Sequence, residues 1–271
     1  MAERGGRGGL RLKVSDLSMI FGGLRAVSGF SCELYHGELV GLIGPNGAGK
    51  TTVFNMLSGI YTPTGGSIAY WDRQAQAHSV GKKAPAALNR MGISRTFQNI
   101  RLFNNLTVED NVRIALHARR KANPLDVLLR LRRFHVDEEH MVERAGELLS
   151  LFKIEHKKGE LARNLPYGEQ RKLEIVRALA SNPALLLLDE PAAGMNPQET
   201  EELMQLIAFI REKFNLTILL IEHDMRLVMG ICERLMVLDY GRTIAQGSPE
   251  EIRKDPAVVK AYLGEEALID T

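Results

Sequence analysis

Continuous apolar runs alternate along the chain with segments whose apolar residues recur every three or four positions. The runs ELVGLIG (38–44), ALLLLDE (184–190) and LTILLIEH (216–223) are typical of strands buried on both faces of a sheet. Residues 197–214 have the spacing of an amphipathic helix. Because strands and helices alternate here, the pattern predicts an α/β fold with a mostly parallel sheet and helices on both of its faces.

The N-terminal part and the middle of the chain have other patterns. Short apolar stretches broken by glycine before residue 37, and a second patch at 67–71, predict small strands joined by turns. Residues 99–180 are charged and have helical spacing, and Thr107 followed by Asp110 is typical of a helix start. We therefore expect a helical subdomain inserted into the α/β fold.

Local signals also mark turns and helix starts in the C-terminal part. Tyr240-Gly241 predicts the turn of a hairpin. Helix starts are predicted at Asn196-Pro197, at Ser248 with Glu251, and at Asp255-Pro256.

Composition narrows the class of protein. The 271 residues, 45% of them hydrophobic, suffice for a substantial core. The net charge of +2 gives no reason to expect nucleic-acid binding, and no apolar run approaches the ~20 residues of a membrane span. Cys32 and Cys232 fit a reducing compartment, as small buried residues. We expect a soluble, cytoplasmic protein whose Gly- and Arg-rich residues 1–11 form a flexible tail.

The stretch GPNGAGKT at 44–51 fits the pattern G-x-x-x-x-G-K-[ST] between a predicted strand and a predicted helix. Its glycines let successive backbone N–H groups point at one phosphate group, which the positive end of the helix also attracts. The Lys50 ammonium is placed for the β- and γ-phosphates and the Thr51 hydroxyl for Mg²⁺. An ordinary glycine-rich turn does not explain Lys and Thr at those places. The predicted nucleotide-binding residues are Gly44, Pro45, Asn46, Gly47, Ala48, Gly49, Lys50, Thr51 and Thr52.

The stretch LLLLDEP at 185–191 supplies acidic partners for this loop. Asp189 emerges at the carboxyl end of a buried strand, where ligands bind in open α/β sheets. We expect Asp189 to hold Mg²⁺ through water and Glu190 to act as general base or to orient the attacking water. The alternative, that both residues merely begin a loop, leaves the phosphate-binding loop without an acidic partner.

Three single residues extend the predicted site. His223 ends the next core strand, where its imidazole is expected to bond the γ-phosphate or the attacking water, although alone it would be taken for a surface residue. Gln98, in SRTFQNI, lies where the sheet core passes into the helical insert and is a candidate ligand of the nucleotide and its metal. Phe21 precedes a Gly-Gly turn and is expected to stack on adenine, with a core aromatic as the alternative.

These pieces follow the order Phe21, 44–51, Gln98, 165–169, 189–190, 194–196 and 223. The ordered set resembles the ATPase subunit of ABC transporters over about residues 12–264. The resemblance implies a P-loop NTPase fold with a RecA-like core, a small antiparallel β subdomain and a helical subdomain. It also implies that two such subunits bind two ATP molecules head to tail, the P-loop of one facing the signature of the other.

The signature is expected in NLPYGEQRKLEIVRAL, at 164–179. Against the family's Leu-Ser-Gly-Gly-Gln, Leu165 and Gly168 match, whereas Pro166, Tyr167 and Glu169 differ. Tyr167 and Glu169 fit one branch of the family, but Pro166 replaces a position whose hydroxyl bonds the partner's γ-phosphate. A helix start tolerates proline. The Gly168 N–H and the helix dipole remain to bind phosphate, and the Glu169 charge opposes them.

Four longer stretches, at 43–68, 95–112, 185–203 and 218–264, are similar to one branch, the ATP-binding subunit of bacterial high-affinity branched-chain amino acid importers. This implies a peripheral protein on the cytoplasmic face of the inner membrane. Its partners would be a second ATPase subunit (a copy or a paralogue), two permeases and, indirectly, a periplasmic binding protein. Alternatives are an ABC transporter for urea or amides, other amino acids or lipopolysaccharide. A non-transport ABC ATPase is a second class, but such proteins usually have a long coiled-coil insertion or two ATPase domains, and this sequence has neither. A P-loop kinase is a third class, and the signature argues against it.

The predicted boundaries combine the patterns with the resemblance. The core and β subdomain take 12–98 and 181–247, the helical subdomain about 99–180, and the C-terminal helices 248–264, with tails at 1–11 and 265–271. Residues 117–134 are basic and partly amphipathic. They fit either a surface for the permease or anionic lipid, or a solvated helix face with its apolar residues packed inward.

Overall fold

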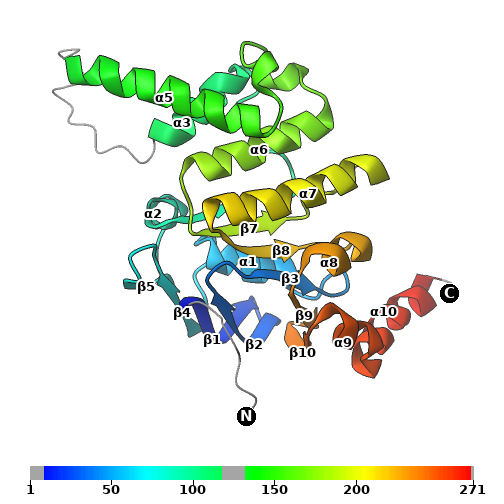
Figure 1. Ribbon diagram of the computed structural model, residues 1–271. Coiled ribbons are helices and arrows are strands. Elements are labelled where there is room, and N and C mark those ends of the chain that lie inside the picture. Colours follow the sequence, from blue (N-terminus) through cyan, green and yellow to red (C-terminus); the bar gives the residue numbers. More distant parts are fainter. Residues whose placement is uncertain (1–8, 118–131, 270–271) are drawn as a thin grey trace. The chain divides into compact units, whose positions relative to one another are not determined.

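The computed structural model describes residues 9–117 and 132–269, which fall into two compact units (Figure 1). The core unit ends its first part at Arg95 and resumes at Ala184, and the helical unit is Thr96–Pro183. Each end of the helical unit lies three residues outside the range expected from the sequence, 99–180. Most of the basic segment 117–134 lies outside the described residues.

A six-stranded sheet, ordered β10-β9-β3-β8-β7-β6, is the framework of the core unit. Neighbouring strands from β9 to β6 pair in parallel, and β10 adds an antiparallel edge. Every residue of β3, β7 and β8 is buried, which explains their continuous apolar runs. The strands are β3 (Leu39–Ile43), β6 (Ile93–Arg95), β7 (Leu185–Asp189), β8 (Thr217–Ile221), β9 (Arg234–Asp239) and β10 (Arg242–Gly247).

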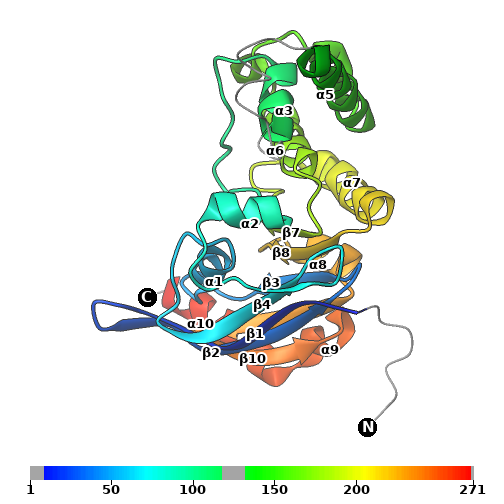
Figure 2. The same cartoon turned by 90° about the vertical axis from the view of Figure 1, so that its left-hand side faces the viewer.

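A second, four-stranded sheet of the core unit is antiparallel and ordered β2-β1-β4-β5. Figure 2 shows β2, β1 and β4 of this sheet. The sheet begins two residues inside the segment expected as a tail. The reason is that the Arg11 guanidinium donates hydrogen bonds to the carbonyls of Trp71 (2.6 Å) and Asp72 (2.7 Å). The strands are β1 (Leu10–Phe21), β2 (Leu24–Tyr35), β4 (Gly65–Trp71) and β5 (Ala77–Ser79).

Helix α1 (Lys50–Leu57) lies between the two sheets, because its buried side chains share one hydrophobic cluster with residues of both. Helices α7 (Pro197–Phe214) and α8 (Met225–Ile231) cover the opposite face of the six-stranded sheet (Figure 1). The core unit also contains α2 (Pro85–Met91), α9 (Pro249–Lys254) and α10 (Pro256–Ile269). The fold is therefore the α/β architecture predicted from the alternation of strands and helices.

The predicted turn and helix starts of the core unit are confirmed. The Asn196 side chain accepts hydrogen bonds from the N–H groups of Gln198 and Glu199 at the start of α7. Ser248 with Glu251 forms a reciprocal capping box before α9, and Asp255 caps α10. The turn between β9 and β10 has positive φ at both Tyr240 and Gly241, as two-residue hairpin turns require.

The helical unit contains α3 (Val108–His117), α5 (Arg132–Leu151), α6 (Tyr167–Ala180) and the 3-10 turns Glu155–Lys157 and Ala162–Asn164. Helix α3 packs against α5 and α6. The Thr107 hydroxyl accepts the N–H of Asp110 at 3.0 Å and so caps α3, as predicted. None of the helices in the described ranges is long and apolar enough to cross a bilayer.

Candidate functional site

Three neighbouring strands of the core unit end at the same edge of the sheet. The loop 44–49 follows β3, Glu222 and His223 follow β8, and Asp189 and Glu190 end or follow β7. Because β3, β8 and β7 are adjacent and parallel, their carboxyl ends lie side by side. The structure thus brings most of the predicted polar residues of the core unit to one edge.

The loop between β3 and α1, the P-loop, has a shape that only glycine permits at two positions. Gly44 has a φ of 146°, and a Cβ there would lie 2.0 Å from the Leu238 carbonyl oxygen. Gly49 has a φ of 99°, and its Cβ would lie 2.7 Å from the Ala26 carbonyl oxygen. No side chain among the described residues caps the start of α1 at Gly49, and its first turn has no acidic residue. The first N–H groups of α1 are therefore suited to an anion such as a phosphate group.

The Lys50 side chain returns over this loop. Its ammonium donates hydrogen bonds to the carbonyl oxygens of Gly44 (2.6 Å) and Pro45 (2.8 Å), and the residue is only 8% exposed. These two bonds hold a positive charge against the P-loop. Thr51, next in α1, is exposed.

The Asp189 carboxylate is buried at the end of β7. Its Oδ2 accepts a hydrogen bond from Nη2 of Arg95 at 2.7 Å. Arg95 was not among the predicted site residues, although it stands in the same stretch, SRTFQNI, that singled out Gln98. Asp189 is therefore held by a partner 94 positions away in the sequence.

Glu190 and His223 face each other across the ends of β7 and β8. The backbone of Glu190 is left-handed (φ 46°), which costs strain for a residue with a side chain, and its N–H bonds the Ile221 carbonyl at 2.9 Å. Oε2 of Glu190 lies 3.9 Å from Nδ1 of His223, longer than a hydrogen bond. The Glu190 side chain is half-buried and that of His223 is largely exposed. A carboxylate and an imidazole thus border the same space.

Glu222 is a second residue of this edge that was not predicted from the sequence. It is fully buried, and its carboxylate accepts the backbone N–H groups of Ala192 (2.8 Å) and His223 (3.1 Å). Burial raises the pKa of Glu222 above its ordinary value, although these N–H groups act in the other direction. The side chain ties the segment after Glu190 to the start of the segment that carries His223.

Phe21 lies on the other sheet of the core unit, at the end of β1 in the hairpin to β2. It is 39% exposed, and its ring meets that of Tyr61 edge to face with centroids 5.2 Å apart. The ring is thus not part of a closed core. Its part in binding adenine stays a prediction.

The remaining predicted residues belong to the helical unit. Gln98 is exposed, and its carbonyl accepts a hydrogen bond from Nη2 of Arg171 at 2.7 Å. Nη1 of the same buried guanidinium bonds the Phe97 carbonyl (2.6 Å) and Glu174 (2.8 Å). Arg171 and Glu174 lie on α6, so this helix holds the backbone of the segment that carries Gln98.

The signature segment 165–169 forms the start of α6. Leu165 is buried, Pro166 is the N-cap residue without a side-chain cap, and Tyr167 is exposed at the first helical position. The Glu169 carboxylate bonds the Lys157 ammonium through both oxygens, at 2.8 and 2.6 Å. This ion pair offsets the negative charge that the sequence placed at the start of the helix.

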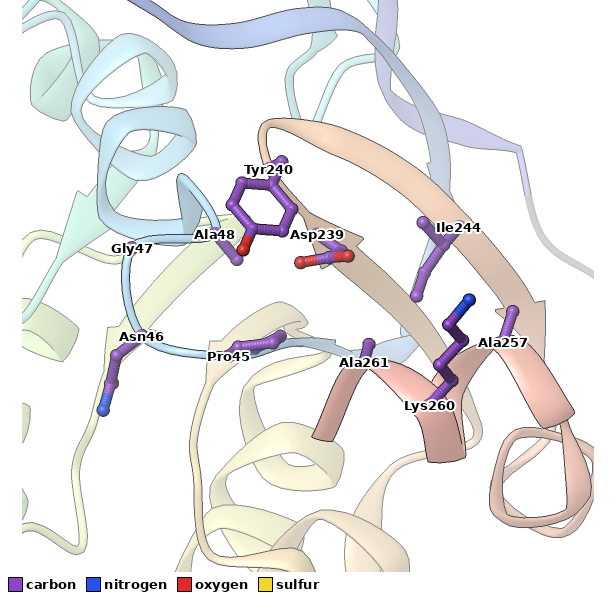
Figure 3. A pocket seen from close by; sticks show the side chains of 10 residues that line it. All are labelled: Pro45, Asn46, Gly47, Ala48, Asp239, Tyr240, Ile244, Ala257, Lys260 and Ala261. Atoms are coloured by element: carbon purple, nitrogen blue, oxygen red, sulfur yellow. The ribbon is translucent and has the colours of Figure 1, made fainter. Parts of the chain in front are cut away.

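A pocket of about 480 Å³ opens beside the P-loop, on the side of the C-terminal helix α10 (Figure 3). Asp239 and Lys260 bring opposite charges to it from β9 and α10. Its lining consists of Pro45, Asn46, Gly47, Ala48, Asp239, Tyr240, Ile244, Ala257, Lys260 and Ala261. Helix α10 therefore lies near the P-loop, a closeness that the sequence did not predict.

Comparisons with known proteins agree with this geometry. A family model described as "ABC transporter" matches residues 27–193, and one described as "Branched-chain amino acid ATP-binding cassette transporter" matches residues 242–267. The high-affinity branched-chain amino acid transport ATP-binding protein LivG of Escherichia coli K12 is 48% identical over 254 residues, covering 94% of this chain and 98% of LivG.

Two further proteins are similar over nearly the whole chain. The lipopolysaccharide export system ATP-binding protein LptB of Escherichia coli K12 is 35% identical over 255 residues, covering 94% of this chain and 98% of LptB. The crystal structure of the ADP conformation of MJ1267, an ATP-binding cassette of an ABC transporter, has a TM-score of 0.80 and 30% identity, covering 94% of this chain and 99% of MJ1267.

Proposed function

The chain belongs to the ABC transporter family of ATP-binding proteins and is an ATPase, and from this we propose that it drives the import of branched-chain amino acids through partner permeases. The observation that carries the catalytic part is the single sheet edge where the P-loop, Asp189, and the facing pair Glu190 and His223 follow three adjacent parallel strands. Groups suited to bind phosphate and a group suited to accept a proton come from separate segments and meet at this edge.

Lys50 and the backbone N–H groups of the P-loop bind the ATP phosphates. The two carbonyl bonds of Lys50 place its charge over the loop. The first turn of α1, which contains no acidic residue, supplies further N–H donors. Phe21 is the candidate platform for the adenine ring.

The donor set in the core unit fits Mg²⁺, which prefers oxygen ligands and keeps several of its waters. Thr51 and Asp189 would hold the ion, Asp189 through water. Gln98 stays a candidate ligand predicted from the sequence. Within the described residues, no three His, Cys, Asp or Glu side chains gather into a metal-binding cluster. When bound, the ion neutralises charge on the phosphate oxygens.

Glu190 accepts a proton from the water that attacks the γ-phosphorus, and the bond from that phosphorus to the ADP oxygen breaks. The products are ADP and inorganic phosphate. His223 donates a hydrogen bond to the γ-phosphate, and its exposed side chain leaves it accessible to the nucleotide. The bond from Glu190 N–H to Ile221 keeps the carboxylate at the end of β8, beside that imidazole.

A complete site includes the signature segment of a second ATPase subunit, a copy or a paralogue, in a head-to-tail ATP sandwich. Pro166 and Tyr167 are exposed at the start of α6, and this exposure supports the role for residues 165–169. Two membrane permeases and, indirectly, a periplasmic binding protein complete the transporter. The chain then works as a peripheral subunit on the cytoplasmic face of the inner membrane.

Two observations favour branched-chain amino acids over lipopolysaccharide. Identity to LivG is 48%, against 35% to LptB over a similar length. The family model for branched-chain amino acid transporters also matches residues 242–267. The ATPase does not contact the transported solute, so the solute must be tested in the assembled transporter.

The test is ATP hydrolysis by the chain assembled with its permeases in lipid vesicles. A binding protein loaded with leucine, isoleucine or valine should stimulate hydrolysis, and the same protein without a ligand should not. The Glu190→Gln variant is the matched control for contaminating ATPases. Stimulation by urea, by amides or by lipopolysaccharide, with none by branched-chain amino acids, would refute the proposed solute and leave the ATPase assignment intact.

A further inference from the structure

Arg95 is almost enclosed between two elements of the candidate site. It is the last residue of β6, and it pairs in register with Leu187 of β7, two residues before Asp189. Its Nη2 donates to Oδ2 of Asp189 at 2.7 Å, and the two side chains are only 5% and 4% exposed. The ion pair is therefore largely shielded from water.

The other end of the guanidinium bonds helix α1. Nη1 of Arg95 donates to Oδ1 of Asn55 (2.7 Å) and to Oγ of Ser58 (2.8 Å). The group also lies over the Phe54 ring, 5.5 Å from its centroid. Helix α1 begins at Lys50 and Thr51, so one planar group connects the helix of Thr51 to the strand of Asp189.

We propose that Arg95 is a positioning residue that sets the spacing and orientation of the two groups that would hold Mg²⁺ in the core unit, the Thr51 hydroxyl and, through water, the Asp189 carboxylate. The proposal rests on the proposed function, because it assigns those two residues to the ion. Bonding Oδ2 to a rigid donor fixes the plane of the Asp189 carboxylate and so the direction of its other oxygen. Partners that orient a metal ligand in this way commonly change metal affinity about 10- to 100-fold when they are removed.

A buried ion pair also has a simpler role, in which it serves only the stability of the fold. Removing one partner of such a pair leaves an uncompensated charge and destabilises a protein wherever the pair lies. The core unit offers a matched pair for this role. Arg234 bonds Glu38 at 2.9 Å, with side chains 13% and 5% exposed. Glu38 directly precedes β3 and Arg234 begins β9, so this pair lies at the amino edge of the sheet, away from the site.

The test compares nucleotide affinity with and without the metal. Binding of a fluorescent ATP analogue is measured in excess Mg²⁺ and in EDTA, in the Glu190→Gln background to prevent turnover. We expect Arg95→Met to reduce the gain in affinity that Mg²⁺ provides by about tenfold or more, while the affinity in EDTA stays within about twofold. Arg234→Met should lower the melting temperature and leave the gain unchanged.

Two further variants separate spacing from charge. Arg95→Lys keeps the charge but cannot bond both Asp189 and helix α1. It should therefore fold and still lose part of the gain in nucleotide affinity that Mg²⁺ provides. The double change Asn55→Ala with Ser58→Ala keeps the bond to Asp189 and releases α1, and it should also reduce the gain.

Several outcomes would overturn the proposal. One is that Mg²⁺ increases the nucleotide affinity of Arg95→Lys as much as that of the protein with Arg95. Another is that Arg95→Met loses nucleotide affinity equally in Mg²⁺ and in EDTA. An unchanged gain in the double variant would refute the link to α1. If the protein with Arg95 unchanged did not bind ATP at all, that result would instead refute the proposed function.

Discussion

The carboxylate of Glu222 accepts the backbone N–H of Ala192 at 2.8 Å, two residues after Glu190. The same carboxylate accepts the N–H of His223 at 3.1 Å. One buried side chain thus fixes the backbone beside both members of the facing pair. It fixes the His223 backbone, from which the largely exposed imidazole reaches within 3.9 Å of the Glu190 carboxylate.

Glu222 should make stability depend on pH in a direction that can be measured. Burial raises its pKa in the folded protein above the ordinary value of about 4.3, so the folded state binds more protons than the unfolded state above that pH. The contribution of Glu222 to stability is therefore complete below about pH 4 and decreases as the pH rises through the raised pKa. The melting temperature of the wild type minus that of Glu222→Gln should fall as the pH rises.

A second carboxylate provides a control of opposite sign. Hydrogen bonds from Ser248 lower the pKa of Glu251 in the capping box before α9. Stability from Glu251 is present above the ordinary pKa and lost as the pH falls through the lowered value. The difference between wild type and Glu251→Gln should therefore rise with pH. If the Glu222→Gln difference also rose, the N–H bonds to Glu222 would outweigh its burial.

Lys50→Ala should abolish ATP binding and leave the fold intact. The ammonium bonds the carbonyls of Gly44 and Pro45, and its removal takes the charge from the phosphate site. Calorimetric titration with ATP, beside a melting curve, makes the comparison. Normal affinity in the variant would refute the assignment of the P-loop.

Glu190→Gln and His223→Ala should separate hydrolysis from binding. Gln keeps the shape of Glu190 but cannot accept the proton, so MgATP should bind while turnover falls steeply, by about 100-fold or more. The bound state should accumulate as a dimer of ATPase subunits if the chain pairs with itself. His223→Ala should slow hydrolysis with a smaller effect on affinity. Unchanged turnover in the first variant, or loss of binding alone in the second, would contradict these roles.

The parts of the site that the sequence predicted share a local signal. Glycines around Lys50, a carboxylate at the end of an apolar run, and a histidine after the next such run can each be recognised within a few positions. The helix start at Asn196 and the hairpin turn at Tyr240 are local in the same sense, and both are confirmed.

Arg95 and Glu222 were not predicted, because their partners are distant in sequence. Arg95 meets Asp189 across 94 positions, and Glu222 meets Ala192 across 30. In the sequence, each is a charged residue beside a strand, where an exposed position is the usual expectation. Arg171 is a similar case, because an arginine in a charged helix gives no sign that it is buried against the Gln98 backbone. Which charged side chains are buried becomes clear only from the way the strands and helices pack.

Pro166→Ser tests two effects that the structure makes separable. Pro166 is the N-cap of α6 and provides no side-chain cap, so Ser should stabilise the helix by about 1 kcal/mol. The new hydroxyl would also bond the partner's γ-phosphate, and a hydrogen bond to a charged group is worth about 1.5–3 kcal/mol. Turnover at the partner's site should then rise by about tenfold for every 1.4 kcal/mol gained.

The measurement is single-turnover hydrolysis in the assembled transporter, with the P-loop Lys replaced in one subunit at a time. Pro166→Asp is the matched control, because Asp caps a helix as Ser does but repels phosphate. Pro166→Asp should raise the melting temperature and slow turnover at the partner's site, whereas Pro166→Ser should raise both the melting temperature and that turnover. Lys157 already offsets Glu169 in this turn, so the carboxylate there does not oppose the gain. If Ser raised the melting temperature and left the partner's rate unchanged, the hydroxyl would be dispensable, and the backbone near Gly168 with the helix dipole would carry recognition.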